Sequence, residues 1–189
     1  MQRALLEVAL LSVGAGLLGT WIVLRGLAFF SHAVGTAAFP GLVLADGLGF
    51  AAPLGAFATA VLFAGGVARL AGAAPGETPG ARRGGYDSVT ALVLVGCLAL
   101  GVILASDVFH SGSGVEGLLF GSLLLIDDGD LALAGIASAL ALAATWTLGP
   151  RWLARGFDPV AARSLGAGGG ALDVVLLGLI ALASVAALS

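Results

Sequence analysis

Apolar residues fill most of the chain in long runs that are separated by shorter polar segments. A hydrocarbon core about 30 Å thick is crossed by about 20 residues of helix, so runs of this length predict membrane-spanning helices. The second run is interrupted by Pro40 and several glycines, which indicates a discontinuous helix. The pattern predicts six spans, at residues 4–24, 33–49, 52–71, 88–106, 130–149 and 171–188.

The polar segments between the spans have loop chemistry. Residues 72–87 are rich in Gly and Pro, residues 107–129 hold SGSG and an Asp pair, and residues 150–170 begin with Pro-Arg. Positive residues accumulate in cytoplasmic loops. We therefore expect loops 72–87 and 150–170 in the cytoplasm, and loop 107–129 and the N-terminus outside. The arginines behind this assignment are Arg25, Arg69, Arg82, Arg83, Arg151, Arg155 and Arg163.

Composition excludes several classes of protein. Apolar residues make up 59% of the 189 residues and charged residues only 10%, with a mean hydropathy of +1.10. An ordinary soluble domain carries about 25% charged residues, so a soluble enzyme is excluded. The net charge of −3 and eight scattered arginines exclude a nucleic-acid-binding module. The first apolar run, to about Leu24, is too long for a cleaved signal peptide, and the single Cys97 forms no internal disulfide.

Ionisable residues at membrane depth are costly, so each one is a functional candidate. Glu7 lies within two turns of the start of the first span, where we expect its side chain to extend to the interface. Asp46 is expected to be a loop acid or helix cap at the outer end of the second span. Asp173 begins the last span, where a helix cap is the favoured role.

His32 is the strongest candidate ligand. It lies in FFSHAVGTAAFPG, where Thr36 follows four residues later on the same helix face. Imidazole is a common metal ligand, and a proline such as Pro40 frees backbone carbonyls that can coordinate a cation. A structural histidine that hydrogen-bonds to a neighbouring helix explains the pattern equally well.

A second group lies in the outer loop, where His110 is accompanied by Asp107 and Glu116. Such a cluster attracts cations, although a solvated loop is the favoured interpretation. The sequence has no HExxH, nucleophile elbow, P-loop or Cys pair. We therefore expect no catalysis by this chain, and a motor for transport would be a separate protein.

The stretch FDPVAARSLG is typical of a short capped helix. Asp158 suits the N-cap and Pro159 the first helical position, with a helix from Val160 to Ser164 and a stop at Gly166. Such a helix could lie on the membrane surface. Its capping favours docking to a cytoplasmic partner instead.

Four stretches together resemble the membrane-spanning permease subunit of bacterial ABC transporters for zinc, manganese and iron (the ABC-3 type). In the order of the chain they are GLAFFSHAVGTAAFPGLVLADGLG at 26–49, YDSVTALVLVGCLALGVILAS at 86–106, EGLLFGSLLLIDDGDL at 116–131, and FDPVAARSLGAGGGALDVVLLGLIALASVAAL at 157–188. Their order and spacing agree with the family along nearly the whole chain.

The resemblance implies a fold and a function. Residues 1–189 would form a single permease domain, an all-α polytopic bundle of about six transmembrane helices in the plasma membrane, with a short cytoplasmic coupling helix at 157–166. Two permeases would enclose a path for a divalent metal ion. A cytoplasmic ATPase would dock at the coupling helix, through Asp158, Pro159, Arg163 and Gly166, and an external metal-binding protein would dock near 107–129. No resident cofactor is implied.

Two departures from the family pattern bear on this expectation. The family has an Asp–His pair on the metal path, and we place His32 and Thr36 at those positions, a change that removes a negative charge and makes the site softer. The chain also corresponds to roughly the first two-thirds of such a permease. The alternatives are therefore an ABC permease for a non-metal small solute, or a truncated or accessory membrane protein without transport activity.

Overall fold

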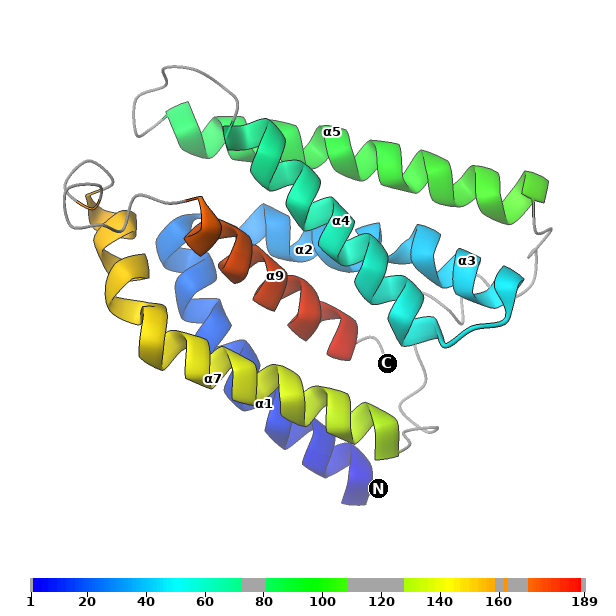
Figure 1. The fold of residues 1–189 in the computed structure, drawn as a ribbon, viewed down its shortest axis with the longest axis horizontal. Coiled ribbons are helices and arrows are strands. Elements are labelled where there is room, and N and C mark those ends of the chain that lie inside the picture. Colours follow the sequence, from blue (N-terminus) through cyan, green and yellow to red (C-terminus); the bar gives the residue numbers. More distant parts are fainter. Residues whose placement is uncertain (1, 73–80, 109–127, 159–161, 163–169, 188–189) are drawn as a thin grey trace.

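The computed structural model describes residues 2–72, 81–108, 128–158, 162 and 170–187. Within these residues the chain is helical and contains no strand (Figure 1). The elements are α1 (Gln2–Arg25), α2 (Ala28–Ala37), α3 (Phe39–Leu48), α4 (Ala52–Gly72), α5 (Ala81–Ile103), a π-helical turn η1 (Leu104–Val108), α7 (Asp128–Phe157) and α9 (Ala171–Ala186).

The helices confirm the predicted all-α membrane bundle. In the described residues, five helical segments are long and apolar enough to cross a membrane, and the second of them, Ala28–Leu48, combines α2 and α3. The predicted sixth span corresponds to α9, a shorter apolar helix. Large apolar side chains also face outward on several helices, as lipid contact requires, among them Val23, Leu62, Leu92 and Trp146.

Two boundaries differ from the sequence expectation. Helix α5 already begins at Ala81, inside the segment expected to be a loop. Helix α7 continues through Pro150 to Phe157, although the proline predicted a loop from residue 150. Tertiary packing explains the second difference, because the turn after Pro150 carries the fully buried Trp152, whose Nε1 donates a hydrogen bond to the Leu172 carbonyl at 3.0 Å.

The second span is broken, as its proline and glycines predicted. Ala38 separates α2 from α3, and Pro40 lies in the first turn of α3, where a missing N–H costs no helical hydrogen bond. Ala38 is also the midpoint of the span Ala28–Leu48. The break therefore lies about halfway through the bundle.

Helix α9 occupies the middle of the bundle and packs against α4, α7, α2 and α1 (Figure 1). The core around it holds two aromatic pairs. Trp21 of α1 meets Trp152 of α7 edge-on at 5.4 Å, and Phe30 of α2 stacks on Phe63 of α4 at 5.6 Å. These pairs tie helices that are distant in sequence to one core.

Successive spans alternate in direction along the long axis of the molecule, and α2 and α3 run the same way as the two halves of one span (Figure 1). The C-terminal ends of α1, α4 and α7 and the N-terminal ends of α5 and α9 lie together on the left of Figure 1. Arg25, Arg69, Arg82, Arg83, Arg151 and Arg155 all belong to helix termini at this end. We call it the arginine end of the bundle.

Candidate functional site

His32 and Thr36 both lie on α2, between the arginine end and the break at Ala38. The buried residues of α2 are Phe30, Ala33, Val34 and Ala37, whereas His32 is exposed and Thr36 is partly exposed. The pair therefore lies on the face of α2 that is turned away from the core. No hydrogen bond from His32 to a neighbouring helix is found in the described part of the chain.

The described residues contain no group of three or more His, Cys, Asp or Glu side chains that could hold a metal ion. Within those residues His32 therefore does not belong to such a group. Most metal sites need several ligands around the ion. A metal at His32 that needs two or more further His, Cys, Asp or Glu ligands would have to draw on another molecule or on residues outside the described ranges.

Helix α4 supports the break that follows this pair. Gly41 of α3 and Gly55 of α4 place their backbones in direct contact, since a Cβ atom on either glycine would overlap the other's carbonyl oxygen. One turn further along α4, the Thr59 hydroxyl lies 3.3 Å from the carbonyl oxygen of Ala38. The position of α3 and of the break relative to α4 is therefore set by a close helix crossing.

The remaining acidic candidates are dispersed. Asp46 is exposed in the last turn of α3, and Asp107 is exposed in η1, while His110 and Glu116 lie outside the described residues. Glu7 is only 6% exposed, so the expected extension to the interface is wrong. Its Oε2 atom has no hydrogen-bond partner among the described residues. The α1–α7 contact covers this part of α1.

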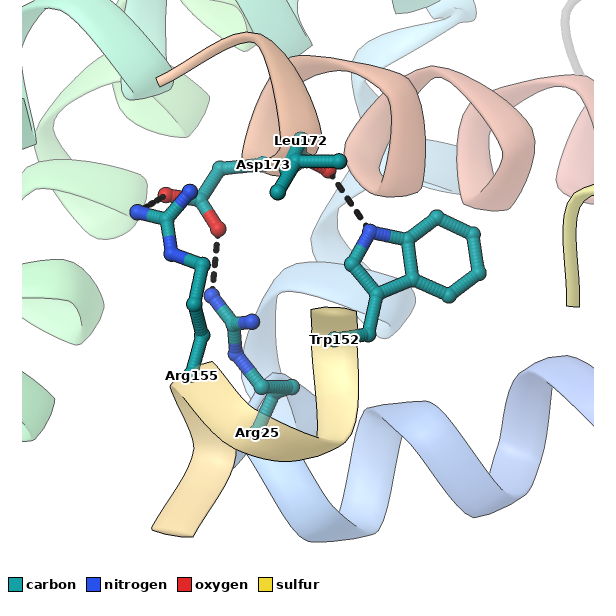
Figure 2. A network of polar contacts seen from close by, with 5 residues as sticks. All are labelled: Arg25, Trp152, Arg155, Leu172 and Asp173. Atoms are coloured by element: carbon teal, nitrogen blue, oxygen red, sulfur yellow. Dashed lines mark hydrogen bonds and ion pairs between the residues drawn. The ribbon is translucent and has the colours of Figure 1, made fainter. Parts of the chain in front are cut away.

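Asp173 is the centre of a polar network at the arginine end (Figure 2). Its Oδ1 pairs with Nη2 of Arg25 from α1, and its Oδ2 accepts a hydrogen bond from Nη2 of Arg155 from α7 at 2.7 Å. The three side chains are 16–19% exposed. The predicted cap role is wrong, because the N-cap of α9 is Gly170 and makes no side-chain cap bond.

Trp21 and Trp152 connect helices in the same region as this polar network. Trp152 joins α7 to the first turn of α9 through its bond to the Leu172 carbonyl (Figure 2), and Trp21 Nε1 lies 3.2 Å from the Thr145 hydroxyl of α7. A cavity of about 430 Å³ lies beside them. Its lining is free of charged side chains and so does not suit a divalent cation: Trp21, Val23, Leu24, Trp152, Leu153, Gly156 and Phe157.

The expected docking residues begin where α7 ends. Asp158 is exposed, and its carbonyl accepts a hydrogen bond from the Ala162 amide at 3.0 Å, as in one turn of helix. Ala162 is buried and helical. Pro159, Arg163 and Gly166 lie outside the described residues.

Sequence reasoning missed the ionic network because it weighed each ionisable residue separately. Arg25 and Arg155 entered only as topology markers, and Asp173 only as a cap. A usable signal was present: two arginines and one aspartate all end or begin spans at the same predicted side. Charges at one end of a bundle tend to find partners, because an unpaired charge near lipid is costly.

The chain matches known proteins along its full length. It is 30% identical to the manganese transport system membrane protein MntC of Halalkalibacterium halodurans, with 100% of this chain and 62% of that protein covered. It is 29% identical to the chelated iron transport system membrane protein YfeD of Yersinia pestis, covering 100% and 60%.

A solved structure is also similar, that of PsaBC from Streptococcus pneumoniae in complex with Fab. Its TM-score is 0.74 at 27% identity, with 100% of this chain and 65% of that chain covered. The chain thus spans less than two thirds of the length of each of these proteins. The model of the ABC 3 transport family matches residues 1–189. The chain therefore belongs to the ABC 3 transport family.

Proposed function

We propose that this chain is the membrane-spanning subunit of an ATP-driven importer that carries a divalent metal ion across the plasma membrane. The observation that supports it most is the family match over residues 1–189, together with relatives named for manganese and iron transport. Manganese and iron are accordingly the favoured cargo, ahead of zinc. The metal is the substrate of transport and not a resident cofactor.

The orientation proposed for the chain follows from the arginine end. Six arginines on described helix termini belong to one end of the bundle, and positive residues accumulate on the cytoplasmic side. The connections from α4 to α5 and from α7 to α9 are then cytoplasmic, and the segment 107–129 and the N-terminus are external. An external metal-binding protein would deliver the ion near loop 107–129.

The transport path is proposed along the outward face of α2. His32 and Thr36 lie on that face, and the helix break at Ala38 follows at mid-depth, as in transporters that bind ions at broken helices. A second permease copy facing the first would place two such faces around a central path. Two imidazoles could then supply the ligands that one chain lacks in its described part.

ATP hydrolysis is assigned to a separate cytoplasmic ATPase, because the sequence has no P-loop. The docking surface proposed for it is the segment 157–166, with Asp158, Pro159, Arg163 and Gly166. Asp158 at the start of this segment is exposed, as contact with a partner requires.

The test is radioactive manganese uptake by cells that lack other importers. Replacing His32 by Ala should lower uptake about tenfold or more, the scale on which metal sites lose affinity when even a supporting group is removed. Ser31→Ala is the matched control, because its hydroxyl bonds only to the Ala28 carbonyl of its own helix at 2.9 Å. Unchanged uptake by His32→Ala at normal membrane abundance would remove His32 from the path. Absence of uptake by the unsubstituted system would contradict metal import.

A further inference from the structure

The ionic network joins the two helix ends that flank the segment between α7 and α9. Arg155 lies in the last turn of α7 and Asp173 in the first turn of α9, and their side chains meet at 2.7 Å. Residues 158–170, which include most of the proposed docking segment, lie between these two helix ends. The ends on either side of that segment are therefore held to one another directly.

A second bond joins the same two helix ends. Trp152 of α7 is fully buried and donates its Nε1 hydrogen to the Leu172 carbonyl, one residue before Asp173. An ion pair and a hydrogen bond, about one helical turn apart on α7, restrict both sliding and rotation of one helix against the other. The two helix ends are thus joined at two separate points (Figure 2).

Arg25 links α1 to the same helix ends. It comes from the last turn of α1 and uses the Asp173 oxygen that Arg155 leaves unused. Trp21, one turn earlier on α1, packs edge-on against Trp152 at 5.4 Å. One carboxylate therefore connects three helices, and an aromatic pair supports the connection. The sequence separation between Arg25 and Asp173 is 148 residues, so contacts between residues close in sequence cannot replace this ion pair.

The connection through Asp173 depends on opposite charges on the side chains that it joins. With the side chains only 16–19% exposed, water screens the pairs weakly. Loss of Asp173 would remove both ion pairs and leave two arginines facing each other, whereas loss of either arginine would remove one ion pair only. The two ion pairs of the network can therefore be removed one at a time by substitution.

We propose that Asp173 is a positioning residue of the transport cycle, which makes the cytoplasmic ends of α1, α7 and α9 move as one body when the ATPase displaces the segment 157–166. This inference rests on the proposed function, specifically on docking of the ATPase to that segment. Arg155 transmits the displacement between α7 and α9, and Arg25 extends it to α1. Neither arginine is required for the ATPase to bind.

The experiment compares Arg25→Met and Arg155→Met in the complete transporter, purified with its ATPase and reconstituted in liposomes. The readout is the amount of Mn²⁺ transported per ATP hydrolysed. Both variants should retain the ATPase, yet transport per ATP should fall about fivefold or more, the lower range of free-energy coupling between two sites. Arg155→Lys, which keeps the charge, should recover much of the loss.

Arg151→Met is the matched control, because Arg151 is an exposed arginine one turn earlier on α7. It should transport as much Mn²⁺ per ATP as the unsubstituted protein. The melting temperature of each complex separates a coupling defect from unfolding. A normal ratio in both test variants, or an equal fall in Arg151→Met, overturns the inference. If the unsubstituted complex transports no Mn²⁺ or does not retain the ATPase, the proposed function fails first.

Discussion

Gly41 on α3 and Gly55 on α4 are in backbone contact, so that neither position has room for a methyl group. Two helices can approach this closely only where both carry glycine at the crossing. In a bilayer such contacts stabilise helix pairs because lipid provides no hydrophobic drive for association. The crossing lies next to the break at Ala38 and packs α3, the second half of the second span, directly against α4.

Replacing Gly41 by Ala should destabilise the bundle by about 1–3 kcal/mol, the usual cost of overpacking. The cause is overlap with the Gly55 carbonyl and the Thr59 side chain. Thermal unfolding of the detergent-solubilised protein measures it. Gly65→Ala on α4 is the control, because an added Cβ there meets nothing within 4 Å. Equal melting temperatures for Gly41→Ala and Gly65→Ala would contradict the close crossing.

Trp152 offers a test of the link between α7 and α9. Trp152→Phe keeps an aromatic ring but removes the hydrogen bond to the Leu172 carbonyl, and should cost about 1 kcal/mol. Trp146→Phe on the same helix is the control, since Trp146 is 84% exposed and should change stability by about 0.5 kcal/mol or less. The melting temperatures of the two variants provide the comparison.

The proposed orientation can be tested by cysteine labelling. Cys97 is first replaced by Ser, and a single cysteine is then placed at Ser113 or Gly80. A reagent that does not cross membranes should label the Ser113→Cys variant in intact cells and leave the Gly80→Cys variant unlabelled. Opening the cells should make Gly80→Cys reactive. The reverse pattern would invert the proposed topology.

Docking of the ATPase can be tested at Arg163. Arg163→Glu reverses the charge in the middle of the segment 157–166 and should abolish co-purification of the ATPase, because an acidic group paired with Arg163 would then meet a like charge, which is strongly unfavourable at an interface. Membrane abundance of the permease should not change. Arg69→Glu, on a different helix of the arginine end, is the control for a general effect of charge. Normal assembly of Arg163→Glu would remove the segment's docking role.

Much of the fold could be predicted from hydrophobic run lengths alone. Each predicted span contains a helix, because a lipid environment leaves the backbone few alternatives. The break in the second span followed from Pro40. The continuation of α7 through Pro150 did not, since it depends on the burial of Trp152 between α7 and α9. Proline destabilises a helix locally by removing a backbone hydrogen bond. Packing against a helix that is distant in sequence outweighs that cost.

The candidate site was predictable only in part. The sequence placed His32 and Thr36 on one helix, but their outward direction depends on which face of α2 meets the core. The ionic network at Asp173 forms only when three helices come together. The partners of Asp173 are 148 and 18 residues away in the sequence. The pattern of residues within one helix does not predict such contacts between helices. The burial of Glu7 depends in the same way on the packing of α1 against α7.

The length of α7 links this protein to the thickness of its membrane. Its 30 residues rise about 45 Å at 1.5 Å per residue, and about 42 Å at an ordinary tilt of 20°. The hydrocarbon core is only about 30 Å thick, so the helix extends beyond it by two turns or more. Arg151 and Arg155 near its C-terminal end suit the phosphate layer. Longer acyl chains would draw this end inward, and the rate of transport should therefore vary with the lipid composition of the bilayer.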